Sequence, residues 1–259
     1  MVIFHSDLDN TLIYSYKRDI GKDKVCTEIY QEREISFMTK KSYELLKIVN
    51  EKVIIVPTTT RTKEQYERIF LGIEPPKYAL VCNGGVLLVN GVEDENWYKE
   101  SQKLAQDCHG ELKKAQEWLQ RDSNTSFEVR NIRDLFIFTK NSRTEYAKEM
   151  LENVLDLSLV EVLLNGVKIY VMPKILNKGE ALKRFKKRME KYDPEKIIAA
   201  GDSLFDIEML KQADVALMPE RLAQSYSSGE CIQTIGVAKS EIFSEYLLNY
   251  IIMISGRKV

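Results

Sequence analysis

Two aspartates, Asp7 and Asp9, come directly after the first apolar run of the chain, residues 2–6. Such a run is typical of a strand buried on both faces of a parallel sheet, and ligands bind beyond the carboxyl ends of such strands. While the chain stays extended, a spacing of two places both carboxylates on one side. The pair can hold a divalent cation, or divide into a nucleophile and a general acid–base. The simpler interpretation is a helix cap or a turn.

Hydroxyl groups follow the second apolar run, residues 53–56, in the segment Thr58-Thr59-Thr60-Arg61. Hydroxyls and backbone N–H groups at a strand end can hold a phosphate oxygen, although a threonine cap of the next helix would explain one of the three. Lys178 opens a later helix and could also reach a phosphate. Because the chain contains 38 lysines and arginines, a surface lysine is the alternative interpretation.

Two further acids, Asp202 and Asp206, follow a predicted strand at residues 196–200. Clustered carboxylates repel one another unless a cation or a lysine lies among them. A helix cap would explain one of these acids but not both. The sequence therefore predicts several charged side chains at one edge of a sheet.

The surrounding elements alternate between strands and helices, which predicts an α/β fold with a parallel sheet and right-handed crossovers. Apolar runs predict strands at residues 2–6, 53–56, 78–82, 196–200 and 215–217. Amphipathic patterns predict helices at 39–51, 63–71, 178–191, 206–212 and 240–252. A hairpin is predicted at 24–37, and an edge strand at 232–234.

Residues 93–168 follow a different pattern, α-β-β-α-β-β, with helices at 101–121 and 143–155. Strands are expected at 127–130, 135–140, 159–164 and 167–172, the last two joined by the hairpin signal Asn165-Gly166. Paired antiparallel strands with helices on one face indicate an α+β unit. We therefore expect an inserted domain at 93–168 between the two halves of a Rossmann-like parallel-sheet core, 1–92 and 169–259.

The composition excludes some partners. The formal net charge is −1, which gives no electrostatic case for nucleic acid or an anionic membrane. No apolar segment approaches the roughly 18 residues of a membrane span, and no signal peptide is recognisable at the start. The four cysteines show no C-x-x-C spacing, which favours reduced thiols in a cytoplasmic protein.

The motifs D-x-D-x-T, a threonine segment, a lysine and G-D-S-x-x-D occur in this order, each beyond a predicted strand. This arrangement resembles the haloacid dehalogenase-like phosphatase superfamily. The α-β-β repeat of residues 93–168 resembles the type 2B cap of the branch that holds Cof-type sugar phosphatases and sucrose-phosphatase-like enzymes. The resemblance implies a lid that closes over the site and a small-molecule phosphate ester as substrate. The sequence gives no basis for inferring a protein partner.

The resemblance also implies a role for each site residue. Asp7 would be the nucleophile, and Asp9 the general acid–base. Lys178 would steady Asp7 and the phosphate, and Asp206 would orient Lys178 or a metal-bound water. The expected ligands of Mg²⁺ are Asp7, the Asp9 carbonyl and Asp202. Thr59 would bind the phosphoryl group, and the expected substrate-binding residues around it are Thr58, Thr60, Arg61, Asn83 and Gly84.

Two departures from the motifs leave one alternative open. Thr60 stands where the branch has the glycine of T-G-R, so Thr58 could take the place of Thr59. Asn10 stands where the branch often has glycine, which the superfamily tolerates.

The function implied is a Mg²⁺-dependent phosphatase that hydrolyses a small phosphate monoester, with a sugar phosphate as the expected class. The reaction would pass through an aspartyl-phosphate intermediate. Two alternatives stay open: a sugar phosphomutase with the same intermediate, and a non-catalytic sugar-phosphate sensor. The sensor ranks last because the nucleophile and the other charged motif residues are all present.

Overall fold

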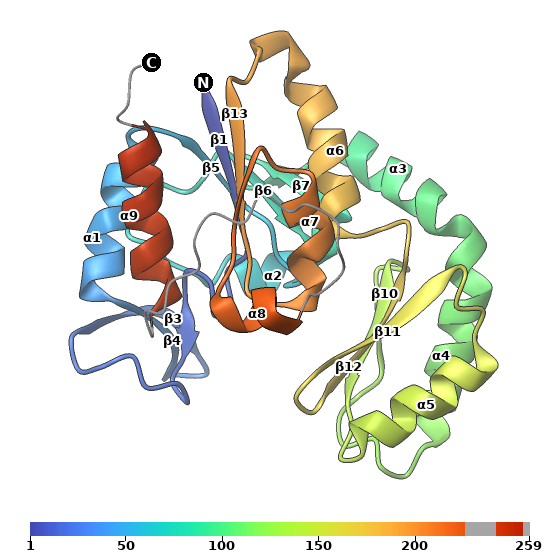
Figure 1. Ribbon diagram of the computed structural model, residues 1–259. Helices are drawn as coiled ribbons and strands as arrows, with labels where there is room; N and C mark the ends of the chain where they lie inside the picture. Colours follow the sequence, from blue (N-terminus) through green and yellow to red (C-terminus); the bar gives the residue numbers. More distant parts are fainter. Residues whose placement is uncertain (226–241, 256–259) are drawn as a thin grey trace. The chain divides into compact units, whose positions relative to one another are not determined.

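The computed structural model describes residues 1–225 and 242–255 (Figure 1). The chain divides into a core unit, Met1–Glu93 with Lys178–Val259, and an inserted unit, Asp94–Asn177. The edge strand predicted at 232–234 and Cys231 lie outside the described residues.

The centre of the core unit is a parallel sheet with the strand order β14-β13-β1-β5. Its strands are β1 (Val2–Ser6), β5 (Ile54–Pro57), β13 (Lys196–Ala200) and β14 (Val215–Leu217). β1 pairs in parallel with β13 on one side and with β5 on the other. The predicted α/β class with a parallel sheet is confirmed, and the segments after these strands leave the sheet at one edge.

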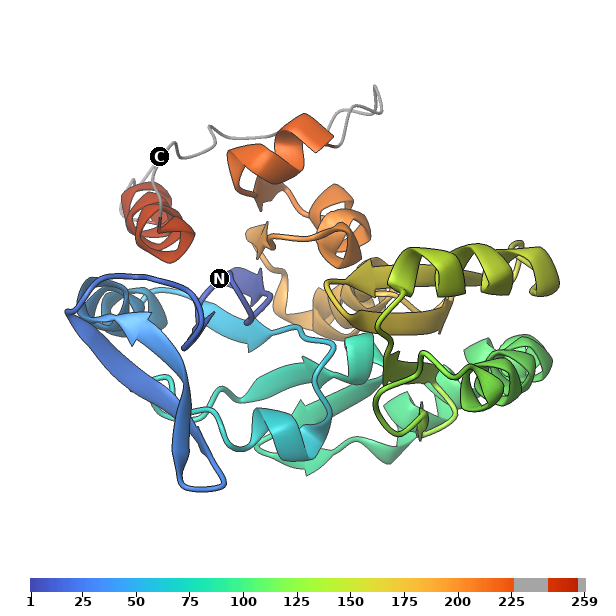
Figure 2. The same cartoon turned by 90° about the horizontal axis from the view of Figure 1, so that it is seen from below.

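Helices cover both faces of this sheet (Figures 1 and 2). On one face lie α1 (Lys40–Asn50) and α9 (Phe243–Ser255), and on the other lie α6 (Lys178–Met189) and α7 (Ile207–Lys211). Successive residues of a strand point to opposite faces. Phe4 accordingly packs with the hydrophobic side chains of α1 and α9, whereas the ring of His5 meets Phe185 of α6 at 5.1 Å.

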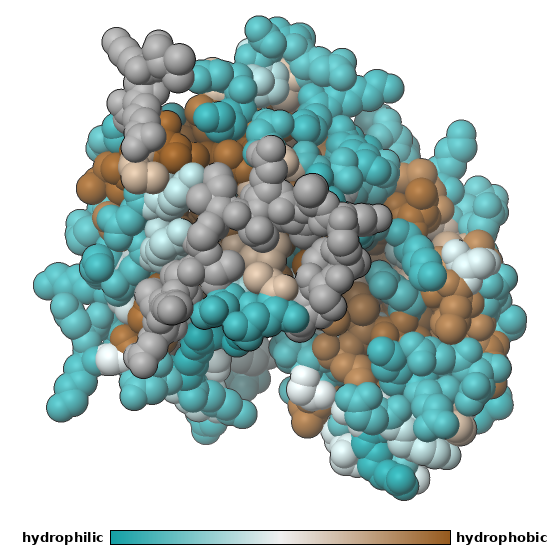
Figure 3. Space-filling model, viewed as in Figure 1, coloured by the Kyte–Doolittle hydropathy of each residue, from teal (hydrophilic) through white to brown (hydrophobic). Residues whose placement is uncertain are grey.

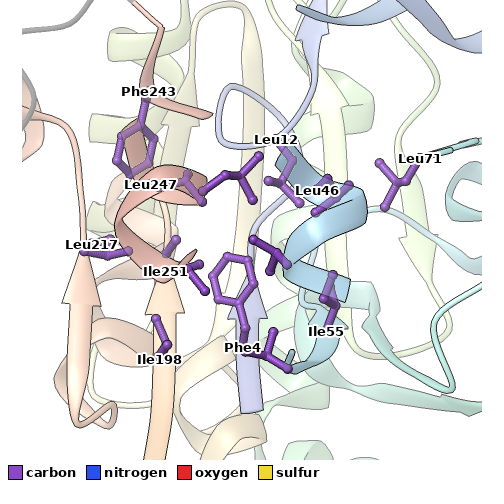
Figure 4. Packing of buried hydrophobic residues seen from close by; sticks show 14 of the residues in the cluster. Phe4, Leu12, Leu46, Ile55, Leu71, Ile198, Leu217, Phe243, Leu247 and Ile251 are labelled. Carbon is purple, nitrogen blue, oxygen red and sulfur yellow. The ribbon is translucent and has the colours of Figure 1, made fainter. Parts of the chain in front are cut away.

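The hydrophobic core of the first face holds these elements together (Figure 4). Leu46 of α1 and Leu247 and Ile251 of α9 gather over Phe4 and Ile198 of the sheet, and all five are buried. Burying one such side chain stabilises the fold by about 1.5–3 kcal/mol. This packing holds together the strands that end at the acids.

Two smaller antiparallel sheets complete the core unit, with the orders β2-β4-β3 and β6-β7-β8. The first contains β2 (Tyr14–Ser15), β3 (Lys24–Tyr30) and β4 (Arg33–Thr39), and β3 and β4 form the predicted hairpin. The second contains β6 (Tyr78–Val81), β7 (Val86–Val89) and β8 (Val92–Glu93). The short helices are η1 (Cys82–Gly84), η3 (Glu190–Tyr192), η4 (Leu204–Asp206) and α8 (Glu220–Ser225).

Two expectations for the core unit differ from the structure. The strand at 78–82 was expected in the parallel sheet, but β6 pairs with β7 in a separate sheet, and a parallel bridge between Leu80 and Thr58, the residue after β5, joins the two sheets. The short turn after β6 brings the next strand back antiparallel. The helix expected at 63–71 ends early, as α2 (Lys63–Tyr66), because Ile69 and Phe70 pair with β3 instead.

The inserted unit is an antiparallel sheet, β11-β12-β10-β9, with helices α4 and α5 on one face (Figure 2). Its helices are α3 (Glu95–Ala105), η2 (Gln106–Cys108), α4 (His109–Arg121) and α5 (Thr144–Val154). Its strands are β9 (Arg130–Ile132), β10 (Phe136–Lys140), β11 (Val160–Asn165) and β12 (Lys168–Pro173). The single helix expected at 101–121 is two helices that meet at η2.

The boundary of the inserted unit lies later than the expected residue 168. β12 pairs with both β10 and β11, which places residues 169–173 in the inserted unit, and this unit ends at Asn177. On the face shown in Figure 3, hydrophilic side chains cover most of the described surface, and hydrophobic patches lie among them. Within residues 1–225 and 242–255, no helix is both long and apolar enough to cross a membrane.

Candidate active site

The predicted site residues begin where the parallel strands end. The amide of Asp7 donates to the carbonyl of Ala200 at 2.9 Å, and the amide of Thr58 donates to the carbonyl of Ser6 at 2.7 Å. These bonds continue the pairing of β1 with β13 and β5 by one residue. Asp7, Thr58 and the segment that begins at Gly201 therefore meet at one edge of the sheet.

Lys178 joins two of the acids. Its Nζ donates to Oδ1 of Asp7 and to Oδ1 of Asp206, both at 2.6 Å. The Lys178 side chain is 1% exposed. Burial would lower its pKa, but the carboxylates of Asp206 and Asp7 raise the pKa of Lys178 above its usual value, so the ammonium stays charged. The lysine that sequence alone could not separate from a surface residue is a buried cation at the centre of the acids.

Glycine at position 179 lets Lys178 reach this place. A Cβ there would lie 2.4 Å from the backbone oxygen of Glu208 in α7, a separation that real Cβ atoms do not show. The first turn of α6 therefore packs directly against α7. This close approach positions the lysine at the N-terminal end of α6 beside Asp206.

Both carboxylate oxygens of Asp206 accept hydrogen bonds. Its Oδ2 accepts from the amides of Asp202 and Ser203, both at 3.0 Å, and from the Ser203 hydroxyl at 2.9 Å. Its Oδ1 accepts from Lys178. Gly201 also lies against it, since a Cβ at Gly201 would be 2.2 Å from the Asp206 Cβ. Asp206 therefore fixes both the loop after β13 and the lysine.

Carboxylate oxygens of Asp7, Asp202 and Asp206 lie within 4.8 Å of one another. Such hard oxygen donors, with no histidine or cysteine in the group, suit Mg²⁺. Both oxygens of Asp206 accept hydrogen bonds, whereas Lys178 contacts one oxygen of Asp7 and Arg221 one oxygen of Asp202, so Asp7 and Asp202 are the carboxylates that fit a cation. Asp202 also pairs with Arg221 of α8, a residue that the sequence did not point to.

Concentrated negative charge changes the pKa values of these acids. Burial raises the pKa of Asp7, the charge of Lys178 opposes that rise, and the carboxylates of Asp206, Asp202 and Asp9 add to it. Burial raises the pKa of Asp202 to about 7, and Asp206 adds to this shift. A cation beside Asp7 and Asp202 would favour their ionised forms.

Asp9, the second acid of the first motif, pairs with Arg61. The guanidinium donates from Nε to Oδ2 at 2.7 Å and from Nη2 to Oδ1 at 2.8 Å. The Asp9 side chain is 50% exposed, whereas that of Arg61 is 13% exposed. Although burial opposes it, the bonds and charges of Asp9 and Glu28 raise the pKa of Arg61. The sequence did not identify Glu28 as a site residue, because polar and apolar residues alternate only weakly in this hairpin.

The threonine segment and the loop after β6 lie against each other. The amide of Thr59 donates to Leu80 at 2.8 Å, and the amide of Asn83 donates to the carbonyl of Thr59 at 2.9 Å. Asn83 and Gly84 are buried, with φ values of 58° and 87°. This left-handed backbone suits asparagine and glycine. It brings the predicted substrate-binding residues of two loops together.

The hydroxyls of the threonine segment differ in their partners. Thr58 Oγ1 donates to the carbonyl of Val56 at 3.1 Å and contacts Nδ1 of His5 at 3.1 Å. Thr59 Oγ1 accepts from the amide of Arg61 at 3.2 Å. Both threonines are buried, whereas Thr60 is half-buried.

The fold is that of a haloacid dehalogenase-like protein. The model of the haloacid dehalogenase-like hydrolase family matches residues 87–218, about half of the chain. The chain therefore belongs to the haloacid dehalogenase-like hydrolase family. The resemblance stated from the motifs and the prediction of an enzyme are confirmed.

Solved structures with the same fold include two sugar-phosphate phosphatases. The sucrose-phosphatase of Synechocystis sp. PCC6803, determined in complex with sucrose and phosphate, is 16% identical, with a TM-score of 0.65 and coverage of 96% of this chain and 97% of that chain. The trehalose-6-phosphate phosphatase of Aspergillus fumigatus is 16% identical, with a TM-score of 0.53 and coverage of 99% and 93%.

A third structure is the haloacid dehalogenase-like hydrolase yhjK of Bacillus subtilis. It is 16% identical, with a TM-score of 0.54 and coverage of 99% of this chain and 92% of that chain. At these identities the three likenesses show a common fold. No curated protein matches the sequence significantly.

Proposed function

We propose that this protein is a Mg²⁺-dependent phosphatase that hydrolyses a small phosphate monoester through an aspartyl-phosphate intermediate on Asp7. The observation that carries the proposal is the position of Lys178, whose Nζ lies 2.6 Å from both Asp7 and Asp206. A buried cation on the first acid after β1 can neutralise charge when an anionic phosphate approaches an anionic nucleophile.

The chemistry has two displacement steps. A carboxylate oxygen of Asp7 attacks phosphorus, the bond from phosphorus to the ester oxygen breaks, and Asp9 gives a proton to the leaving oxygen. Water then attacks the phosphorus of the acyl phosphate, Asp9 takes up a proton, and the bond to Asp7 breaks. Inorganic phosphate is released and Asp7 is restored. Acid–base help of this kind contributes about 10²–10⁴ in rate.

Asp7, Asp202 and the Asp9 carbonyl are the groups that would hold Mg²⁺. When bound, the ion supplies positive charge to the phosphoryl oxygens. The loop after β13 presents Asp202 through the two amides that bond to Asp206. Asp206 acts in this proposal by orienting Lys178 and that loop.

Thr59 is the favoured phosphoryl-binding threonine. The Thr58 hydroxyl donates to Val56, whereas the Thr59 hydroxyl accepts from Arg61 and can still donate to a phosphate oxygen. Thr60, Asn83 and Gly84 would line the same region, because the loop after β6 bonds to the threonine segment.

A small sugar phosphate is the proposed substrate class. The support is the shared fold with the sucrose-phosphatase and the trehalose-6-phosphate phosphatase. We propose that the inserted unit serves as a cap that limits the size of the substrate and excludes water. A phosphate-release screen should then favour sugar phosphates over phosphopeptides in kcat/KM. Equal values for both classes would contradict this part of the proposal.

The test of the reaction is hydrolysis of p-nitrophenyl phosphate. We expect Mg²⁺-dependent turnover that excess EDTA abolishes, and an Asp7→Asn variant that folds but does not turn over, because an amide cannot form the acyl phosphate. Asp193→Asn is the matched control, since Asp193 is exposed and its left-handed backbone accepts asparagine. Full activity in EDTA, or more than a few per cent of wild-type kcat in Asp7→Asn, would contradict the proposal.

A further inference from the structure

Glu28 is a buried carboxylate in the β3–β4 hairpin, and its side chain is 0% exposed. The register of the hairpin is irregular at this residue: Cys26 pairs with Phe37 and Glu28 pairs with Ser36, so β3 has one extra residue between them. Such a bulge redirects a side chain, and bulges are common beside active sites. Because of the extra residue, Thr27 and Glu28 are both buried although they are adjacent.

Two arginines and a serine surround the Glu28 carboxylate. Oε2 accepts from the Ser36 hydroxyl at 2.8 Å and from Nη1 of Arg61 at 2.9 Å. Oε1 accepts from Nε and Nη2 of Arg68 at 3.3 and 3.2 Å. The segment that carries Arg68 is tied to the hairpin by the bond from the Phe70 amide to the Thr27 carbonyl. Both carboxylate oxygens of Glu28 therefore accept hydrogen bonds, from Ser36 on the paired strand and from Arg61 and Arg68 on a second segment.

Arg61 bridges this buried carboxylate and Asp9. Its Nη1 also approaches the carbonyl of Gln65 at 3.5 Å, and its Nε and Nη2 hold both oxygens of Asp9. A bidentate guanidinium–carboxylate pair fixes the plane of the carboxylate as well as its distance. Asp9 is half exposed, and an exposed ion pair by itself constrains little. The buried Glu28 carboxylate restrains the Arg61 guanidinium, and the guanidinium in turn restrains the carboxylate of Asp9.

We propose that Glu28 is a positioning residue for the general acid–base Asp9, acting through Arg61. This inference rests on the proposed function, because it needs Asp9 to transfer protons. Proton transfer demands hydrogen-bond reach and correct orientation, and small displacements in an active site can cost about 10²-fold in rate. The hairpin therefore contributes to catalysis without touching the substrate.

The step that reports on Asp9 is hydrolysis of the aspartyl phosphate. With p-nitrophenyl phosphate the leaving group departs without a proton, so phosphorylation of Asp7 needs little from Asp9, whereas attack by water still needs a base. Glu28→Gln keeps the size of the side chain and one acceptor for the arginines. We expect it to slow phosphoenzyme hydrolysis about tenfold or more, a part of the acid–base contribution. Stopped-flow traces should show a burst of p-nitrophenolate approaching one equivalent per site.

A double-mutant cycle tests whether Glu28 acts through Arg61. Glu28→Gln should have less than about a twofold effect in an Arg61→Lys background, because lysine cannot form the bidentate pair. Glu34→Gln is the matched control: Glu34 is an exposed carboxylate in the same hairpin. It should change no kinetic step by more than about twofold.

The outcomes separate the inference from the proposed function. If wild-type protein forms no phosphoenzyme on Asp7, the proposed function fails and this inference fails with it. If wild-type protein turns over normally and Glu28→Gln hydrolyses its phosphoenzyme at the wild-type rate, only the inference fails. An undiminished effect in the Arg61→Lys background also refutes it. Equal loss of both chemical steps, in proportion to a loss of folded protein, would show a structural role and refute it too.

Discussion

Replacing Lys178 by methionine removes the one cation that Asp7 and Asp206 share in the described structure. Each pair at 2.6 Å is worth roughly 6 kcal/mol at an effective dielectric constant of about 20. Removing the buried ammonium also removes its desolvation penalty of several kcal/mol, and proton uptake by Asp7 limits the loss further. The net expectation is a decrease of about 3–5 kcal/mol in the free energy of unfolding at neutral pH.

The sign of the pH dependence follows from the Asp7 carboxyl group. Lys178 opposes the effect of burial, so without it the pKa of Asp7 rises further above its usual value. A carboxyl whose folded pKa is raised destabilises the fold at pH values above its unfolded pKa of about 3.9. The deficit of Lys178→Met should therefore be largest near pH 8 and should shrink as the pH falls toward about 4.

Urea denaturation in metal-free buffer at pH 8 and pH 5 measures both expectations. Lys187→Met is the matched control, because Lys187 is an exposed residue of the same helix, and it should change stability by less than about 0.5 kcal/mol. If Lys178→Met lay within about 1 kcal/mol of the wild type at pH 8, or if its deficit grew on acidification, the reasoning about the buried pairs would be refuted.

Two more predictions concern backbone packing and a buried ring. Gly179→Ala should lower the free energy of unfolding by about 1–3 kcal/mol and reduce turnover, because its Cβ would meet the backbone of α7. The control is Gly110→Ala, which should stabilise the protein slightly because there is open space around Gly110. Equal melting temperatures for the two variants would contradict this prediction. Burial, with a contribution from Lys186, lowers the pKa of His5 to about 3, so the wild type should lose stability as the pH falls below about 6.5. His5→Leu should lose less between pH 6.5 and pH 4 in urea denaturation, and an equal loss would refute the assignment of a neutral buried imidazole.

The sequence pattern of a single segment was sufficient to predict some of the strands, the acidic cluster and the inserted unit. The apolar run before Asp7 predicted β1, and the acids at 202 and 206 were expected to need a cation because like charges repel. The change of pattern near residue 93 predicted an inserted α+β unit. Its far boundary was missed by nine residues, since the sequence did not reveal that β12 pairs with β10 and β11 and that the unit continues to Asn177. Strand β6 was misassigned because an apolar run does not reveal its partner.

The charged contacts of the site were decided by tertiary structure. Lys178 and Asp7 are 171 residues apart, and Glu28 and Arg61 are 33 apart. Sequence by itself determined which groups could do chemistry and which strand ends would carry them. Their pairing depended on the sheet order, on the close approach of α6 and α7 at Gly179, and on the bulge that turns Glu28 inward. Side-chain partners far apart in a chain have no local signature, because packing alone brings them within hydrogen-bond distance.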